Sequence, residues 1–160
     1  MTRSQLGRWL VVGALVAWPA RSALGQSGPH VSISPFAGVE FRSNQNPLFG
    51  LSALIRIPAE MAGTVAVSTV RSTGVWQLEV GLRWPAISDA PVTPYVGGAF
   101  CLLRWPSADL AGNASWRPGA VATGGIEARA GAVGVFGEAV AVTDGTWAFQ
   151  LRAGLRLQAP

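Results

Sequence analysis

The sequence contains no lysine, one cysteine and one histidine, and its charged residues make up only 12 % of the chain. A Walker-type phosphate loop requires a lysine, so that class of nucleotide site is excluded. One cysteine cannot form an intramolecular disulfide or a thiolate zinc site, and one histidine leaves little for a histidine-ligated metal. The sequence thus predicts no metal and no cofactor. Disorder is excluded too, because hydrophobic residues reach 49 % and aromatics 9 %.

Residues 1–25 are typical of a cleaved secretory signal peptide. A positively charged start precedes an apolar run from Trp9 to Trp18, and the small-residue triplet Ala23-Leu24-Gly25 follows it. The run is far shorter than the ~20 residues that a bilayer-spanning helix needs. We therefore expect the mature chain to start at Gln26 and residues 26–160 to form a single domain.

Removal of this signal changes the charge of the protein. Arg3, Arg8 and Arg21 would be lost, so nine arginines would face eight acidic residues and the net charge would fall from +4 to +1. A chain with so small a basic excess cannot neutralise a phosphate backbone. Nucleic acid is therefore not an expected partner.

Alternation of apolar with polar or small residues runs through the rest of the chain. The clearest segment places Trp76, Leu78, Val80 and their successors on one face and Gln77 and Glu79 on the other. Strong turn signals such as Asp144-Gly145 separate the segments. The pattern predicts eight strands in an antiparallel up-and-down meander, over about 31–41, 49–57, 64–71, 76–84, 94–105, 120–129, 133–142 and 147–157. The fifth strand has no clear phase, because both of its faces are apolar or glycine.

The polar face of these strands combines glycine with glutamate and arginine, as in Gly125, Glu127 and Arg129. Small residues and opposite charges suit the narrow interior of an eight-stranded barrel. A membrane barrel exposes its apolar face to lipid and keeps its polar face inside. We therefore predict an all-β transmembrane barrel with an internal charge network, because buried charges need partners. Its predicted members are Glu40, Arg42, Arg56, Glu79, Arg83, Glu127, Arg129, Glu138, Arg152 and Arg156.

Several pairings inside this network are expected. Glu40, Glu79 and Glu127 each have an arginine one or two steps away on the same face, at Arg42, Arg83 and Arg129 respectively, and Glu79 is predicted to pair with Arg83. Glu40 is expected within reach of Arg152 or Arg156, since the first strand of a barrel closes against the last. Glu138 is expected to approach Arg129 or another partner across the lumen.

Aromatic residues near the strand ends predict two membrane-interface girdles. Phe41, Phe49, Trp76, Trp105 and Trp147 fall at one rim. Trp84 and Tyr95 fall at the other.

The chain resembles the small eight-stranded outer-membrane barrels of the OmpA/OmpX-like group over about residues 31–157. The segments that carry the resemblance are Thr93-Pro94-Tyr95-Val96-Gly97-Gly98-Ala99, Gly124-Gly125-Ile126-Glu127-Ala128-Arg129, Val135-Phe136-Gly137-Glu138-Ala139 and Leu151-Arg152-Ala153-Gly154-Leu155-Arg156-Leu157. The resemblance implies a monomer in the cell outer membrane, with membrane lipid and the outer-membrane insertion machinery as partners. Such barrels usually end on an aromatic residue, whereas this chain ends Leu157-Gln158-Ala159-Pro160.

We expect a non-enzymatic protein with a structural or surface-interaction role, its partner contacting the loop 106–119, with external specificity also in the loop 43–47. His30-Val31-Ser32 has the spacing of a lipid-modifying His-x-Ser pair, but it lies at the wrong end of its strand for a substrate in the outer leaflet. Two alternatives stay open. One is a soluble secreted or periplasmic barrel that binds a small apolar ligand, and the other is a narrow solute channel.

Overall fold

The computed structural model describes residues 31–57, 61–85, 92–106 and 114–158. The predicted signal peptide and mature start, and His30 of the His-x-Ser pair, lie outside these ranges. No helix within the ranges is long and apolar enough to cross a bilayer.

Eight antiparallel strands form a closed barrel in which each strand pairs with its neighbours in sequence and β1 pairs with β8. This confirms the predicted fold class and meander order. The strands are β1 (Val31–Phe41), β2 (Gln45–Ile57), β3 (Met61–Val70), β4 (Val75–Pro85), β5 (Val92–Trp105), β6 (Ser115–Ala130), β7 (Val133–Thr143) and β8 (Trp147–Gln158).

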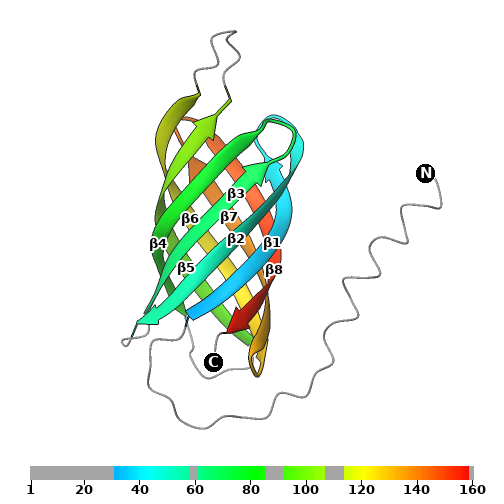
Figure 1. Cartoon of the computed structure of the whole chain (residues 1–160), viewed down its shortest axis with the longest axis vertical. Helices are drawn as coiled ribbons and strands as arrows, with labels where there is room; N and C mark the ends of the chain where they lie inside the picture. The colour runs from blue at the N-terminus through cyan, green and yellow to red at the C-terminus, as the bar shows by residue number, and fades with distance from the viewer. Residues whose placement is uncertain (1–30, 58–60, 86–91, 107–113, 159–160) are drawn as a thin grey trace, which may run out of the picture.

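The two ends of the barrel differ in their connections (Figure 1). One end, called the loop end here, carries the connections 42–44, 71–74, 106–114 and 144–146. The other, called the terminal end, is where β1 begins and β8 ends. Gly145 in the turn between β7 and β8 has a φ of 100°, a conformation that favours glycine and explains the Asp144-Gly145 turn signal.

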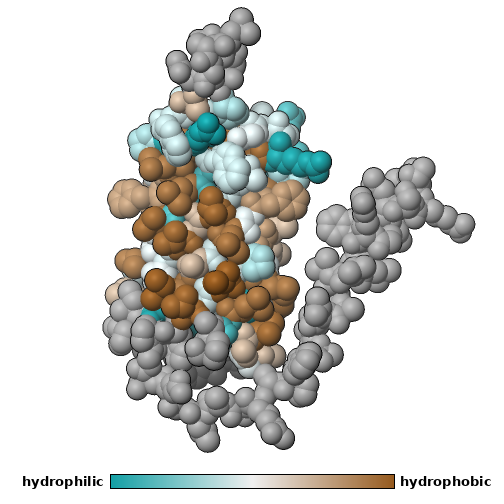
Figure 2. Space-filling view, in the orientation of Figure 1, coloured by the Kyte–Doolittle hydropathy of each residue, from teal (hydrophilic) through white to brown (hydrophobic). Residues whose placement is uncertain are grey.

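Large apolar side chains cover the outside of the barrel, and charged ones are buried inside it. Val80 is 54 % exposed, whereas Glu79 beside it is only 7 % exposed. The visible face carries a broad hydrophobic belt, with hydrophilic residues gathered above it at the loop end (Figure 2). A soluble barrel has the reverse arrangement. The orientation predicted for a transmembrane barrel is therefore confirmed, and this surface does not suit the soluble alternative.

Strands β2 and β6 both begin earlier than predicted, and β2 starts at Gln45, inside the expected loop 43–47. Residues 115–119 belong to β6, which pairs with β5 as far as Trp105 and Ser115, although the sequence analysis assigned 106–119 to a loop. Pro118 and Gly119 suggested a loop because both residues are unfavourable inside strands. Residues 107–113 of the predicted partner-binding loop lie outside the described ranges.

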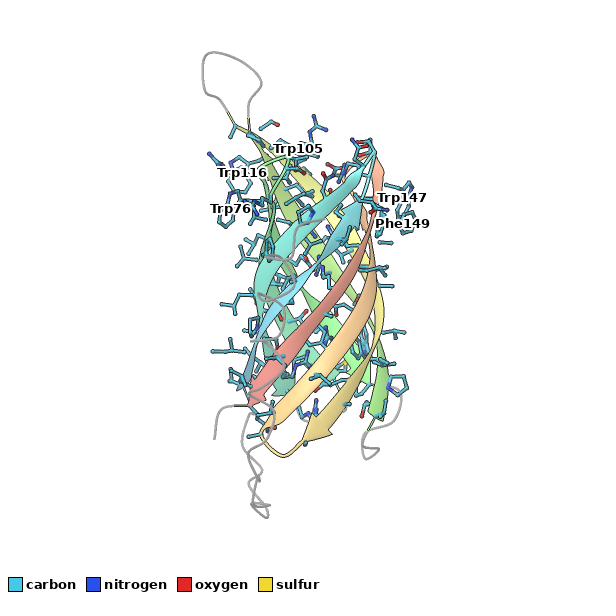
Figure 3. The ribbon with its side chains drawn as sticks, turned by 90° about the vertical axis from the view of Figure 1, so that its right-hand side faces the viewer. Trp76, Trp105, Trp116, Trp147 and Phe149 are labelled. Atoms are coloured by element: carbon cyan, nitrogen blue, oxygen red, sulfur yellow. The ribbon has the colours of Figure 1, made fainter. Side chains whose placement is uncertain are left out.

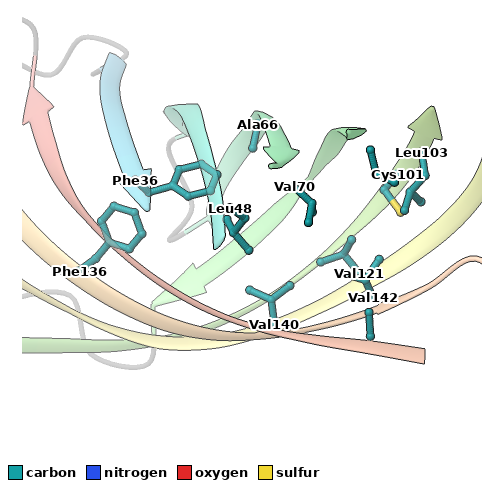
Figure 4. Packing of buried hydrophobic residues seen from close by; sticks show 12 residues of the cluster. Phe36, Leu48, Ala66, Val70, Cys101, Leu103, Val121, Phe136, Val140 and Val142 are labelled. Atoms are coloured by element: carbon teal, nitrogen blue, oxygen red, sulfur yellow. The ribbon is translucent and has the colours of Figure 1, made fainter. Parts of the chain in front are cut away.

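An apolar cluster fills part of the interior (Figure 4). Leu48, Leu103 and Val142 have no exposed surface, and Phe36 and Phe136 extend the cluster along the barrel. Because the lumen of an eight-stranded barrel is only wide enough for side chains, this cluster and the charged residues share a packed core.

Candidate functional site

Arg152 is the centre of the internal charge network. Its Nη2 atom lies 2.6 Å from Oε1 of Glu79, and its Nη1 atom lies 3.5 Å from Oε1 of Glu138. All three side chains are buried. Glu79 lies on β4 and Arg152 on β8, so this ion pair crosses the lumen between strands that are not neighbours. An arginine held by two carboxylates satisfies the requirement that a buried charge be paired.

Glu138 joins the network to Arg83 and Tyr95. Nη2 of Arg83 lies 2.8 Å from Oε2 of Glu138, and the Tyr95 hydroxyl donates a hydrogen bond of 2.8 Å to the same oxygen. The guanidinium carbon of Arg83 lies 3.9 Å from the centre of the Tyr95 ring. The phenol therefore supports Arg83 by a cation–π contact and supplies its carboxylate partner with a further donor.

Two glutamine amides extend the network toward the loop end. Nε2 of Gln150 donates to Oε2 of Glu40 at 2.8 Å and to Oε1 of Gln77 at 3.2 Å. Nε2 of Gln77 donates to Oε1 of Glu79 at 2.9 Å. Nε of Arg152 donates to Oε1 of Gln150 at 2.9 Å. These bonds connect β1, β4 and β8 through side chains alone.

A second ionic cluster lies at the terminal end. Glu127 is 3 % exposed and forms ion pairs with Arg156 and Arg129. Nε of Arg156 also donates to the Ser34 hydroxyl at 3.2 Å. Arg56 lines the same mouth of the barrel with these residues, but its side chain is exposed.

A third ionic cluster closes the loop end. Nη1 of Arg42 lies 3.1 Å from Oδ1 of Asp144 and donates to the Thr146 hydroxyl at 2.6 Å, while its Nε lies 3.7 Å from Glu40. Nε1 of Trp105 donates to Oδ2 of Asp144 at 3.2 Å. Burial raises the pKa of Asp144, but hydrogen bonds from Arg42 and Thr146 and the charge of Arg42 outweigh it and hold the pKa below its usual value.

Glu40 and Glu127 each pair with the arginine that follows on the same face of the strand, Arg42 and Arg129, but two of the other predicted pairings are wrong. Glu79 pairs with Arg152 in place of Arg83, which pairs with Glu138. Glu40 contacts Arg42 and Gln150, with no ion pair to Arg152 or Arg156 among the described residues. Glu138 does meet a partner across the lumen, which is Arg83 on β4, but not Arg129.

Two of the predicted girdle residues point inward. Tyr95 is 3 % exposed and bonded to Glu138, and Trp105 packs against the apolar cluster while its indole N–H bonds Asp144. Both lie on β5, where the sequence pattern left the phase open. The polar group of a buried tyrosine or tryptophan needs a partner. Here each finds a carboxylate inside the barrel, so the girdle assignment of these two residues is wrong.

The other predicted girdle residues, Phe41, Phe49, Trp76, Trp84 and Trp147, lie on the outward face with exposed side chains. Trp116 and Phe149 also project outward near the loop end (Figure 3). The sequence analysis did not predict Trp116 as a girdle residue, because it expected residues 106–119, which include the start of β6, to form a loop. Continuing the alternation back from Ala120 through Pro118 to Trp116 could have revealed it.

The cavities among these described side chains are small. A cavity of about 30 Å³ lies between Phe36, Glu79, Arg83, Glu138 and Arg152, and one of about 10 Å³ lies at the terminal mouth. A single water needs roughly 10–15 Å³ measured in this way. Within the described ranges, no group of three or more His, Cys, Asp or Glu residues is placed to hold a metal ion. The arrangement therefore suits structural pairing of charges.

No protein-family model matches this sequence, and no curated protein matches it. Its fold is similar to several solved structures. The N-terminal β-barrel domain of Pseudomonas aeruginosa OprF has a TM-score of 0.73 at 10 % identity, covering 84 % of this chain and 100 % of the domain. Neisserial surface protein A has a TM-score of 0.65 at 20 % identity, and the match covers 83 % of this chain and 98 % of that protein's chain. Yersinia pestis Ail was solved with the heparin analogue sucrose octasulfate. Its TM-score is 0.53 at 9 % identity, and the match covers 82 % of this chain and 99 % of the Ail chain.

These similarities and the closed eight-stranded topology agree with the OmpA/OmpX-like resemblance of the sequence. The chain therefore has the fold of the small outer-membrane β-barrels.

Proposed function

We propose that the protein is an integral outer-membrane barrel whose interior is closed, with a structural or surface-interaction role and no catalytic activity. The observation that carries this proposal is the combination of an apolar exterior with a lumen filled by paired Glu and Arg side chains. An apolar exterior is stable only where lipid or detergent covers it. The small outer-membrane barrels with the same fold support this location.

A closed interior is proposed over a solute channel. The charge network crosses the lumen, and the apolar cluster adjoins it. A cavity of about 30 Å³ among the described side chains holds one or two waters, which supports a closed interior over an aqueous path. In planar bilayers the purified barrel should give no single-channel steps. Stepwise conductance would favour the channel alternative.

The location is tested by fractionating cells that express the full chain. We expect the protein in the outer-membrane fraction, resistant to extraction by high salt and soluble only in detergent. Unheated and boiled samples should migrate differently in electrophoresis, because a folded barrel is more compact than its unfolded chain. Recovery of a folded protein from the aqueous fraction would contradict the proposal.

The surface role is proposed for the loop end, where the sequence analysis expected a partner at residues 106–119. The exposed Arg117 lies over the ring of Trp105, 5.5 Å from its centre, and Arg42 lies 5.0 Å from the same ring. Arg42 is already paired with Asp144 and Glu40, whereas Arg117 forms no ion pair among the described residues. The guanidinium of Arg117 therefore suits an anionic partner, and the fold neighbour Ail was solved with a sulfated sugar.

Binding of the detergent-solubilised barrel to immobilised heparin tests this role. We expect Arg117→Gln to weaken binding and Arg129→Gln, at the terminal end, to leave it unchanged. Equal binding by all three proteins would remove the support for an anionic partner.

A further inference from the structure

Three residues on adjacent strands form one row on the outside of the barrel. Arg104 of β5 pairs in register with Trp76 of β4 on one side and with Trp116 of β6 on the other. Trp76 is 49 % exposed, Trp116 is 60 % exposed, and Arg104 is also exposed. Figure 3 shows the two tryptophans on the same side of the barrel near the loop end, away from Trp147 and Phe149. We call this set the Trp-Arg-Trp row.

Arg104 differs from the arginines of the internal network. Among the strand residues that the structure describes, it is the only charged residue on an outward-facing row. No described carboxylate forms an ion pair with it, whereas Arg83, Arg129, Arg152 and Arg156 are each paired. The next outward residues on β5 are Leu102, 44 % exposed, and Phe100, 83 % exposed. The cation therefore lies at the upper edge of the apolar belt.

The free energy of placing a charge on the lipid-facing surface depends on its depth in the bilayer, and this indicates where the Trp-Arg-Trp row lies. An outward arginine costs about 2–4 kcal/mol at the bilayer midplane and about 0–1 kcal/mol near the interface. Tryptophan side chains favour the same interface, where their rings meet lipid and their N–H groups meet headgroups. The Trp-Arg-Trp row thus lies at headgroup level, where the nearest anions are lipid phosphates. A guanidinium binds a phosphate through two parallel hydrogen bonds.

We propose that the Trp-Arg-Trp row binds the phosphate of an anionic lipid in the leaflet at the loop end. Arg104 supplies the cationic donors, and the indole groups of Trp76 and Trp116 flank the headgroup on both sides. This proposal rests on the proposed membrane location. It gives the barrel a specific lipid-headgroup site at one position on its circumference. The apolar belt contacts lipid chains all around the barrel without such a site.

The test uses the full mature barrel in an uncharged alkyl-glycoside detergent, after the electrophoretic shift has shown that each variant is folded. Lipid A, which carries two phosphates, is titrated as the probe, and native mass spectrometry measures the lipid-bound fraction. We expect Arg104→Gln to weaken binding about tenfold, since it removes a charge-assisted bidentate contact. Trp76→Leu and Trp116→Leu should each weaken it severalfold.

Arg56→Gln is the matched control. Arg56 carries the same charge and is exposed, but it lines the terminal mouth at the opposite end of the barrel. This variant should bind lipid A like the unmodified protein, and fully dephosphorylated lipid A should not distinguish Arg104→Gln from that protein. Equal binding by the unmodified protein and Arg104→Gln would overturn the proposal. So would equal weakening by Arg56→Gln, or displacement of lipid A by inorganic phosphate at a similar concentration. Because only folded barrels enter this test, its failure leaves the membrane location unaffected.

Discussion

Arg152 and Glu79 form an ion pair of 2.6 Å between β8 and β4, on non-neighbouring strands of the barrel. Both side chains are buried, and Arg152 has Glu138 as its only other carboxylate neighbour among the described residues. The pair therefore links opposite parts of the wall through the interior. Its energetic role can be measured directly.

We expect Glu79→Gln to destabilise the barrel by about 3–5 kcal/mol, because it removes one of two partners from a buried arginine. Arg152→Gln should do the same by leaving Glu79 without a cation. The double variant should lose clearly less than the sum of the two, as measured by a double-mutant cycle of unfolding in detergent. Glu79→Gln combined with Arg129→Gln, at the terminal end, is the control and should be additive within roughly 0.5 kcal/mol. Additivity in both cycles would contradict the pairing.

Tyr95→Phe tests the inward position of Tyr95. The variant keeps the ring over Arg83 but removes the hydroxyl that donates to Glu138. A hydrogen bond to a charged group contributes about 1.5–3 kcal/mol, so a loss of this size is expected in the free energy of unfolding. Trp84→Phe, on the outward face, has no such bond among the described residues and should cost less. A neutral effect of Tyr95→Phe would argue that the phenol faces lipid after all.

The pairing of Asp144 predicts a pH dependence. The carboxyl group has a folded-state pKa below its ordinary value of 3.8, so the folded barrel favours the ionised form. Its contribution is fully present above the ordinary value and is lost as the pH falls through the folded-state pKa. The unmodified protein should therefore be more stable than Asp144→Asn at neutral pH, and this advantage should shrink below about pH 4. An advantage that stayed constant down to pH 2 would contradict the ion pair with Arg42.

Val80→Arg tests the lipid-facing surface. Val80 is 54 % exposed in the middle of the outward face of β4. An arginine at the bilayer midplane costs about 2–4 kcal/mol, so folding into lipid vesicles should be strongly impaired. Val80→Leu, which keeps the surface apolar, is the control and should fold normally. Efficient folding of Val80→Arg would place this face outside the hydrocarbon.

Two glycines predict opposite responses to the same substitution. A Cβ at Gly81 would overlap the carbonyl oxygen of Gly98 and the Cβ of Ala99, whereas a Cβ at Gly124 meets no atom within 4 Å. Overpacking of this kind costs about 1–3 kcal/mol. Gly81→Ala should thus lower the free energy of unfolding in detergent, and Gly124→Ala should leave it nearly unchanged. Equal responses would show that the backbones around Gly81 can move apart.

The order and faces of most strands were predictable because alternation directly reports which side chains share a face. The prediction failed on β5, where Tyr95 and Trp105 lie among glycines and apolar residues that provide no contrast between the faces. It also failed at the start of β6, where Pro118 and Gly119 resemble loop residues.

Partners inside the lumen were harder to predict than the lumen residues themselves. Glu79 and Arg83 are close in sequence and share a face, but four residues of a strand span about 13 Å. Which side chains meet across the lumen depends on the stagger of the strands around the barrel, and alternation carries no information on stagger. Gln77 and Gln150 were not included in the predicted network because they carry no charge. Gln150 nevertheless joins Glu40 to Arg152, and Gln77 joins Gln150 to Glu79.

The cross-lumen contacts also bear on the rigidity of the barrel. Hydrogen bonds between neighbouring strands run around the circumference and do not by themselves prevent the barrel from flattening. The ion pairs Glu79–Arg152 and Arg83–Glu138 connect β4 to the opposite strands β8 and β7 through the interior. Flattening the barrel would break them and separate buried charges. In a membrane, the interior should therefore resist flattening under lateral pressure, and an increase in that pressure should leave the shape of the barrel unchanged.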